Sequence, residues 1–228
     1  MNRQNNNYMW MLVLSAVLVF VMIVSIPGTA VCDQVPELGV KNSTRTVPNA
    51  DGFIQRWLIL EPIAANGDTQ NAVQRIVKTE YFPGQFTVVP KDGDKVTVND
   101  SDLTWHVVDT NEYNVNLYYF AAACGTNCNN ALFWIVVVIN CPEEMTDVRL
   151  AIGSNSASVW WVNGEEVIGI YGNRCTVIDD GVSKRLTLKK GPNVIRGAIV
   201  NASGAADFCA RFLDSEGKPL KGYTVNVE

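Results

Sequence analysis

Short apolar runs separated by turn residues fill the chain from Phe53 onward. They recur about every 8–12 residues, a spacing typical of all-β sandwiches. The Leu132 to Ile139 run is almost wholly apolar and β-branched, which favours a strand covered on both faces. The pattern predicts strands at 56–60, 85–89, 95–98, 103–109, 115–123, 132–139, 148–152, 158–162, 166–171, 183–188, 193–200 and 206–213.

One segment departs from this pattern. Between Thr69 and Glu80, four apolar residues return at helical spacing: Ala72, Val73, Ile76 and Val77. Asp68 or Thr69 could cap the start of this helix. The predicted fold is therefore all-β, with two antiparallel sheets and at most one short helix.

A hairpin is predicted around Asn163-Gly164, which suits a type I′ turn. The strand before it carries Trp160 and Trp161, and successive side chains of a strand point to opposite faces. We therefore expect one indole in the core. The other lies either under a loop or in reach of a ligand.

Composition and charge exclude some function classes. The chain has 228 residues, of which 47% are hydrophobic and 18% are charged, so the bulk of it is not disordered. Eighteen Lys and Arg against 23 Asp and Glu give a net charge of -5, which argues against nucleic-acid binding. A single histidine, His106, leaves little room for imidazole-based chemistry.

The first residues resemble an export signal. Arg3 precedes an apolar stretch from Trp10 to Ile26, and small residues follow it, with Gly28 and Ala30 suited to cleavage after Ala30. An uncleaved membrane anchor and a lipid anchor at Cys32 are the alternatives. All three export the chain to the periplasm, the cell surface or the medium, with membrane contact only through residues 1–32. We predict a signal or anchor at 1–30, a linker at 31–52 and a β-sandwich domain at 53–228.

Two segments resemble the galactose-binding-like jelly rolls that serve as accessory domains of exported glycan-degrading enzymes. They are Leu186 to Ile195, which follows an L-x-L-x-x-G-x-N-x-I pattern, and Asp207 to Asp214, which resembles a closing strand. More narrowly, the chain resembles the non-catalytic N-terminal module of Bacteroidetes-type acetylxylan esterases. The segments that carry this resemblance are 53–63, 81–82, 85–88, 132–134 and 140–144.

The resemblance implies a jelly-roll-like sandwich, a plant cell-wall polysaccharide such as xylan as ligand, and a catalytic esterase as partner. The chain lacks the G-x-S-x-G motif of esterases and ends at Glu228, so we expect no hydrolase domain. His106 lies inside a predicted strand and is interpreted as structural. A glycosidase carboxylate pair would be assembled from distant strands, so the sequence leaves that alternative open.

Sugars bind to rigid aromatic faces with planar polar side chains around them. Trp57 and Trp134 lie in apolar runs and are expected in the core. The predicted ligand-binding residues are Trp161, Trp105, Tyr118, Tyr171, Asn155, Asn173, Arg174 and Asp207.

Cysteines and acidic turns complete the candidates. Cys124 and Cys128 are predicted to form a local disulfide, as is usual in exported chains. No cofactor and no metal site are predicted. The oxygen-rich segments Asp92 to Asp94 and Asn99 to Asp102 could hold calcium, although both are expected to be plain turns.

The sequence thus favours an exported, non-catalytic carbohydrate-binding module associated with xylan degradation. A scaffold or docking domain without glycan affinity is the first alternative. A hydrolase with an unrecognised active site is the second.

Overall fold

The computed structural model of the protein describes residues 46–172 and 174–227. The chain divides into two units, Met1–Asp33 and Gln34–Glu228, and all described residues belong to the second. The predicted export signal, the alternatives at Cys32 and residues 31–45 of the predicted linker lie outside them. Thr46 already pairs with the sandwich, because its carbonyl accepts the Val225 N–H at 2.7 Å. The predicted domain boundaries stay predictions.

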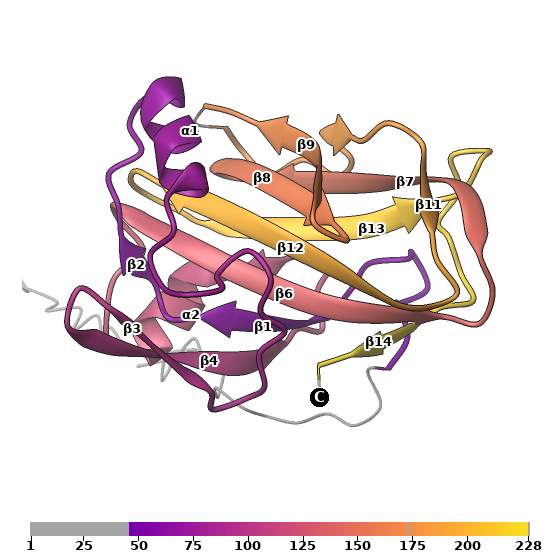
Figure 1. The fold of residues 1–228 in the computed structure, drawn as a ribbon. Coiled ribbons are helices and arrows are strands. Elements are labelled where there is room, and N and C mark those ends of the chain that lie inside the picture. Colours follow the sequence, from indigo (N-terminus) through magenta and orange to yellow (C-terminus); the bar gives the residue numbers. More distant parts are fainter. Residues whose placement is uncertain (1–45, 173, 228) are drawn as a thin grey trace, which may run out of the picture. The chain divides into compact units, whose positions relative to one another are not determined.

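Two antiparallel sheets pack face to face in the described part of the chain, which confirms the all-β sandwich (Figure 1). The larger sheet has the order β3-β4-β1-β6-β12-β8-β9, with β2 and β14 paired to β6. The smaller sheet has the order β10-β7-β13-β5, with β11 paired to β7.

The strands of the larger sheet are β1 (Arg56–Leu60), β2 (Ile63–Ala64), β3 (Lys95–Val98), β4 (Ser101–Asp109), β6 (Ala131–Cys141), β8 (Ala157–Val162), β9 (Glu165–Ile170), β12 (Gly191–Asn201) and β14 (Thr224–Asn226). Those of the smaller sheet are β5 (Val115–Asn116), β7 (Met145–Ser154), β10 (Gly181–Val182), β11 (Leu186–Leu188) and β13 (Asp207–Leu213).

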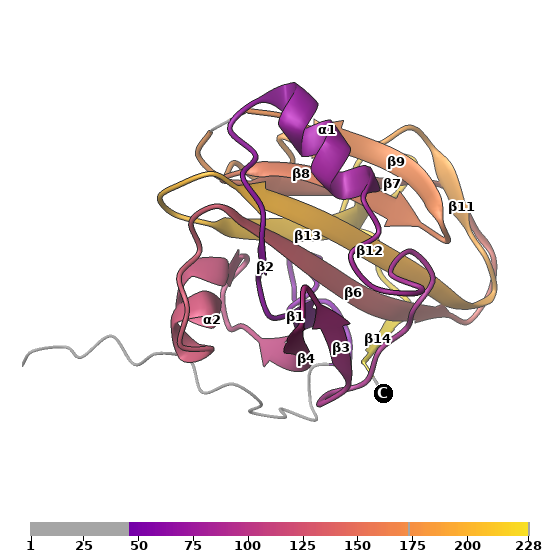
Figure 2. The same ribbon diagram turned by 60° about the vertical axis from the view of Figure 1, so that its left-hand side comes forward.

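The predicted helix is confirmed as α1 (Gln70–Lys78), and its predicted apolar residues are all buried. Thr69 is the cap, because its Oγ1 accepts the Ala72 N–H at 3.2 Å. Helix α1 lies over the outer face of the larger sheet beside β12 (Figure 2).

A second helix corrects the predicted strand at 115–123. Strand β5 ends at Asn116, whose Oδ1 accepts the Tyr119 N–H at 3.1 Å and caps α2 (Leu117–Ala123). The expectation of at most one helix was therefore wrong. An asparagine cap before three alanines was the local signal for a helix.

The predicted strand at 85–89 is also wrong, because this segment forms turns. Gln85 is 1% exposed and holds the loop together from inside. Its side chain accepts the Tyr81 N–H at 2.8 Å and donates to the Thr79 carbonyl at 2.9 Å. These bonds replace the ladder that a strand would make.

The two indoles of β8 divide between the faces as predicted. Trp160 is fully buried between the sheets, with ring centroids 5.9 Å from Trp57 and 5.7 Å from Phe208. Trp161 points the other way and lies 5.5 Å from Trp134 on the outer face of the larger sheet. Trp57 and Trp134 are 0% and 1% exposed, which confirms both as core.

The asparagine of the G-x-N pattern organises two turns at once. Asn193 is buried; it accepts the Lys189 N–H at 2.9 Å and donates to the Lys189 carbonyl at 2.8 Å. Its Oδ1 also accepts from Asn163 Nδ2 at 2.8 Å, and Asn163 in turn accepts the Val194 N–H at 2.9 Å. One buried amide therefore joins the β8–β9 hairpin to the turn before β12.

We expect Asn193→Ala to destabilise the fold by about 2–3 kcal/mol, because it removes several hydrogen bonds of a buried amide and leaves partly buried backbone groups of the turn without partners. Chemical denaturation followed by circular dichroism would measure this. Lys190→Ala, in the same turn but exposed, should change stability by less than about 0.5 kcal/mol. Equal losses in the two variants would contradict this role of Asn193.

Candidate functional site

Two exposed tyrosines flank β5, the edge strand of the smaller sheet. Tyr113 precedes the strand and is 39% exposed, and Tyr118 follows it in α2 and is 54% exposed. Strand β5 pairs with the start of β13 through Asn116 and Asp207. The Tyr118 N–H donates to the Ala206 carbonyl at 3.2 Å, which holds the first turn of α2 beside β13.

Side-chain and backbone groups from three other segments gather around Asp207 at the start of β13. One carboxylate oxygen accepts from Asn114 Nδ2 at 2.7 Å, and the other accepts from the Thr176 hydroxyl. The Asp207 carbonyl accepts the Asn155 N–H at 3.0 Å, and the Asn155 carbonyl accepts the Arg174 N–H at 3.1 Å. The structure thus brings together Asn155, Arg174 and Asp207, three of the predicted site residues.

Arg174 is half-buried in the segment that follows β9. It pairs with Asp180 and donates to the Tyr171 carbonyl at 3.4 Å. Its Nε is buried and has no hydrogen-bond partner among the described residues. Tyr171 follows β9, and its ring folds back against Gly169 of that strand. Asn173 lies outside the described residues.

We call this surface the β5 rim. It combines exposed tyrosine rings with the Asp207 carboxylate, the Asn114 amide and the Arg174 guanidinium, which are already oriented by hydrogen bonds. Its members are Tyr113, Asn114, Tyr118, Asn155, Arg174, Thr176 and Asp207.

The two predicted tryptophans lie on another face. Trp161 is half-buried against Trp134, and the facing residue on β12 is Arg196. Trp105 is 1% exposed, and its ring packs edge-on against Phe82 at 6.5 Å. A ring this buried has no free face for a sugar. The prediction that Trp105 binds a ligand was therefore wrong. The sequence-predicted residues therefore do not form one site.

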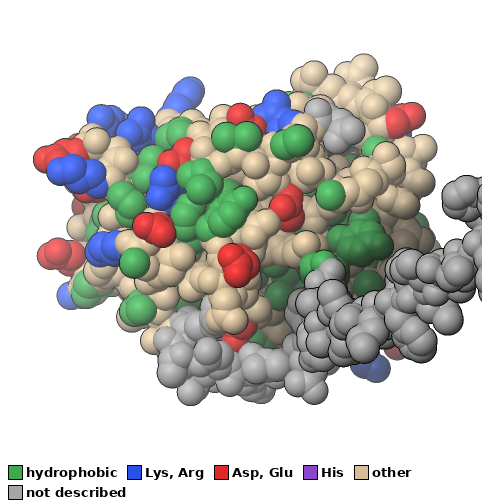
Figure 3. All heavy atoms as spheres, turned by 180° about the vertical axis from the view of Figure 1, so that it is seen from behind, with side chains coloured by type: hydrophobic (Ala, Val, Ile, Leu, Met, Phe, Trp, Pro, Cys, Tyr) green, Lys and Arg blue, Asp and Glu red, His purple; other side chains and the backbone are tan. Residues whose placement is uncertain are grey.

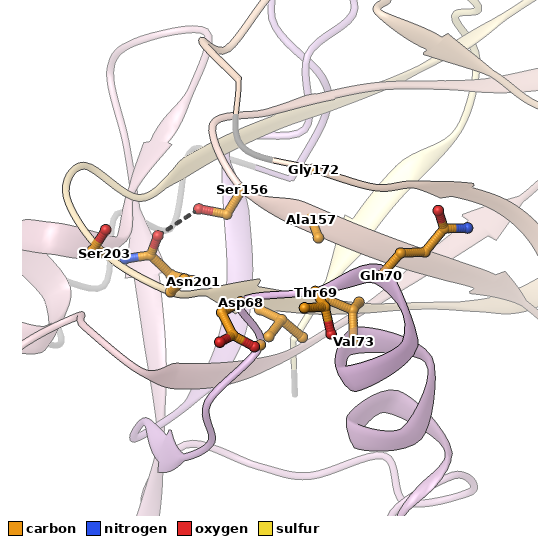
Figure 4. Close-up of a pocket in the computed structure, with 12 residues that line it drawn as sticks. Asp68, Thr69, Gln70, Val73, Ser156, Ala157, Gly172, Asn201 and Ser203 are labelled. Atoms are coloured by element: carbon orange, nitrogen blue, oxygen red, sulfur yellow. Dashed lines mark hydrogen bonds between the residues drawn. The ribbon is translucent and has the colours of Figure 1, made fainter.

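A small cavity lies where the segment before α1 meets the end of β12 (Figure 4). Asp68, Thr69 and Gln70 line one side of it. On the other side, Ser156 donates to Asn201 Oδ1 at 2.7 Å. Its volume of about 80 Å³ is well below the roughly 300–1,000 Å³ of typical ligand pockets.

A larger cleft of about 630 Å³ lies between the β8–β9 hairpin and the segment that carries β11. The hairpin contributes Glu165 and Glu166, and the facing segment contributes Lys184, Arg185 and Lys189. No aromatic ring is among the described residues that line this cleft. Sequence reasoning missed it, because its walls come from two separate turns with ordinary surface charges.

Three reactive side chains meet where α2 ends. A carboxylate oxygen of Glu61, a ring nitrogen of His106 and the Cys124 sulfur all lie within 4.8 Å of one another. Burial raises the pKa of the Cys124 thiol to about 12, and the Glu61 carboxylate adds to this rise. A catalytic cysteine needs a lowered pKa to form its thiolate. The group is therefore not an activated nucleophile.

The predicted disulfide between Cys124 and Cys128 is not formed, and both residues are free thiols. Their side chains meet different partners. The Cys124 sulfur lies with Glu61 and His106, whereas the Cys128 thiol donates to the Gly204 carbonyl at 3.1 Å.

The two acidic segments act as turns. Asp92 Oδ1 accepts the Val107 N–H at 2.9 Å, and Asp94 Oδ2 accepts the Lys91 N–H at 2.8 Å. Asn99 and Asp100 have positive φ angles of 48° and 63°, as the tight turn between β3 and β4 requires. The Asp92 and Asp94 carboxylates thus accept from the backbone, and Asp102 accepts from the Thr97 hydroxyl at 2.9 Å, in line with the plain turns expected from the sequence.

No protein-family model and no curated protein matches this sequence. Among solved structures, a β-glucosidase from Kluyveromyces marxianus is 19% identical with a TM-score of 0.41, over 69% of this chain and 16% of its own. A PA14 sugar-binding domain from an RTX adhesin is 14% identical with a TM-score of 0.36, over 75% of this chain and 74% of its own.

The PA14 domain of the MpAFP antifreeze protein is 13% identical with a TM-score of 0.36, over 72% of this chain and 90% of its own. At these TM-scores the likeness is too distant to carry a function over to this chain. The resemblance to acetylxylan esterase modules stays a prediction from the sequence. Within residues 46–172 and 174–227, no helix is long and apolar enough to cross a membrane.

Proposed function

We propose that the β-sandwich is a non-catalytic domain that binds a carbohydrate chain at the β5 rim. The observation that carries this proposal is the pair of exposed tyrosines, Tyr113 and Tyr118, which flank β5 in the sequence, together with the pairing of β5 to Asp207 and its polar cluster. Exposed rings beside oriented planar polar groups are the combination that sugars require.

The chemistry of the rim suits a sugar in two ways. A tyrosine ring packs against the C–H face of a pyranose and loses little conformational entropy, since it has two rotatable bonds. The Asp207 carboxylate has more acceptor sites than the two hydrogen bonds from Asn114 and Thr176 use. Sugar hydroxyls can therefore donate to it without breaking the cluster.

Xylan is the first polysaccharide to test, and an acetylxylan esterase is the partner that the sequence resemblance implies. An exported chain fits such a ligand, because plant cell-wall polysaccharides lie outside the cell. The signal segment that would direct export is part of the proposal and rests on the sequence alone.

We expect Tyr118→Ala to weaken polysaccharide binding about tenfold, because one stacking contact is worth about 1–1.5 kcal/mol. Affinity electrophoresis of the full chain in gels with xylan, acetylated xylan, cellulose or mannan would measure this. Phe86→Ala removes a ring that is 36% exposed next to Trp134, away from the rim, and should leave retardation unchanged. Equal retardation of Tyr118→Ala and the unaltered chain would rule out the rim as the site.

An apolar surface favours a docking domain as the second candidate function. Val177 and Ile178, which precede β10, are 55% and 44% exposed, and Val182 in β10 is 40% exposed. Figure 3, which views the molecule from behind Figure 1, shows hydrophobic side chains grouped among acidic and basic ones. Exposed apolar groups of this kind often mark protein interfaces. If no polysaccharide gel retards the chain, the docking function is favoured over sugar binding.

A further inference from the structure

Glu61, His106 and Cys124 form a group in which a carboxylate oxygen, a ring nitrogen and a sulfur, each able to bind a metal ion, lie close together. Each comes from a different element: Glu61 follows β1, His106 lies in β4, and Cys124 is the C-cap of α2. The three ligand atoms lie within 4.8 Å of one another, and His106 Nε2 is 3.0 Å from Glu61 Oε1. The His106 and Glu61 side chains keep 22% and 25% of their surface exposed, so an ion can reach them from solvent.

Neighbouring groups fix the orientation of two of the three ligands. The second carboxylate oxygen of Glu61 accepts the Thr104 N–H at 3.0 Å, which turns the first oxygen toward His106. The His106 ring packs edge-on against Phe120 of α2, with ring centroids 6.0 Å apart. Hydrogen bonds such as that from Thr104 to Glu61 orient metal ligands in proteins, and the contact with Phe120 limits the rotation of the His106 ring.

We propose that Glu61, His106 and Cys124 bind a divalent cation of the zinc class. In a tetrahedral zinc site, neighbouring ligand atoms lie about 3.3–3.6 Å apart. His106 Nε2 and Glu61 Oε1, now 3.0 Å apart, therefore separate slightly, and the Cys124 sulfur, within 4.8 Å of both, moves in by at most about 1.5 Å. A thiolate and an imidazole select zinc-class ions over calcium or magnesium, which prefer oxygen ligands. Three protein ligands leave the fourth position for water.

Binding changes the group in a defined way. The cation replaces the direct contact between His106 Nε2 and Glu61 Oε1 and bonds to both atoms. The Cys124 thiol loses its proton to the solvent and bonds to the cation as a thiolate. Helix α2 begins at the β5 rim and ends at Cys124. The ion therefore fixes the C-terminal end of the helix that carries Tyr118.

The test uses the full chain, purified in a mild detergent and freed of metal. Equilibrium dialysis should give one Zn²⁺ bound per chain, and Co²⁺ should give a near-ultraviolet thiolate-to-cobalt absorption band. Cys124→Ser should abolish that band and weaken Zn²⁺ binding by at least about 100-fold, the upper end of the loss seen for outer-sphere partners. Glu61→Gln and His106→Gln should weaken Zn²⁺ binding while leaving the metal-free circular dichroism spectrum unchanged.

Cys175→Ser is the matched control, because Cys175 is an exposed free thiol outside the group. Its Zn²⁺ affinity and Co²⁺ band should equal those of the unaltered chain. A chain that binds no Zn²⁺, or a Co²⁺ band that survives in Cys124→Ser, would overturn the proposal. Neither result depends on polysaccharide retardation, so the metal site and the sugar site are tested separately.

Discussion

Trp160→Ala is expected to cost about 3–5 kcal/mol of unfolding free energy, the range for a large aromatic residue removed from a packed core. Trp160 is fully buried. Its ring contacts Trp57 of β1 in the larger sheet and Phe208 of β13 in the smaller sheet. Its Nε1 donates to Ser158 Oγ at 3.0 Å. The substitution therefore opens a cavity between the sheets and leaves a buried hydroxyl with one partner fewer.

The next residue provides the control. Trp161 is half-buried and packs mainly on Trp134, so Trp161→Ala should cost about 1–2 kcal/mol. Urea denaturation followed by far-ultraviolet circular dichroism compares the two without relying on tryptophan fluorescence. If Trp160→Ala does not fold, Trp160→Phe should fold and still lose more stability than Trp161→Ala. A larger loss in Trp161→Ala would contradict the assignment of the two faces.

The sequence predicted the features that local patterns control. The alternation around Trp160 and Trp161 sets their faces, because side chains alternate in any strand. Helix α1 was predicted because its apolar residues repeat at helical spacing after the threonine cap, Thr69. These signals are contained within a few residues.

Other features depend on a single polar side chain that the pattern of apolar residues does not reveal. The segment around Gln85 has a strand-like composition, but that buried amide bonds the loop backbone and keeps it in turns. Segment 115–123 begins as a strand and becomes a helix once Asn116 caps it. In both cases a single polar side chain overrides the propensity of its neighbours.

The candidate sites show the same division. Asn155, Arg174 and Asp207 were predicted and do meet, yet Asn114 and Thr176, which complete their cluster, carried no signal in the sequence. Glu61 and His106 are 45 residues apart, and they meet because β1 pairs with β4. Sequence patterns identify the strands, but the register between them determines which side chains share a site.

Asp109→Ala is the other substitution expected to cost about 3–5 kcal/mol, because it leaves a buried guanidinium without its counter-charge. Arg56 in β1 and Asp109 in β4 face each other across the strand pair. Arg56 donates from Nε and Nη2 to the two carboxylate oxygens, each at 2.8 Å, and the two side chains are 10% and 7% exposed. This is the bidentate geometry in which removal of one partner costs most.

Two further variants separate the loss of a charge from the loss of a pair. Replacing both residues with leucine removes both buried charges and should recover most of the stability lost in Asp109→Ala, since apolar pairs can substitute for buried ion pairs. Glu216→Ala breaks the exposed pair with Lys218, whose side chains are 67% and 72% exposed, and should cost less than about 0.5 kcal/mol. Urea denaturation of all three variants measures these differences.

If Asp109→Ala lost no more stability than Glu216→Ala, the buried pair would contribute nothing to holding β4 against β1. A double variant as unstable as Asp109→Ala would instead show that the hydrogen bonds between the two side chains, rather than the charge left behind, account for the loss.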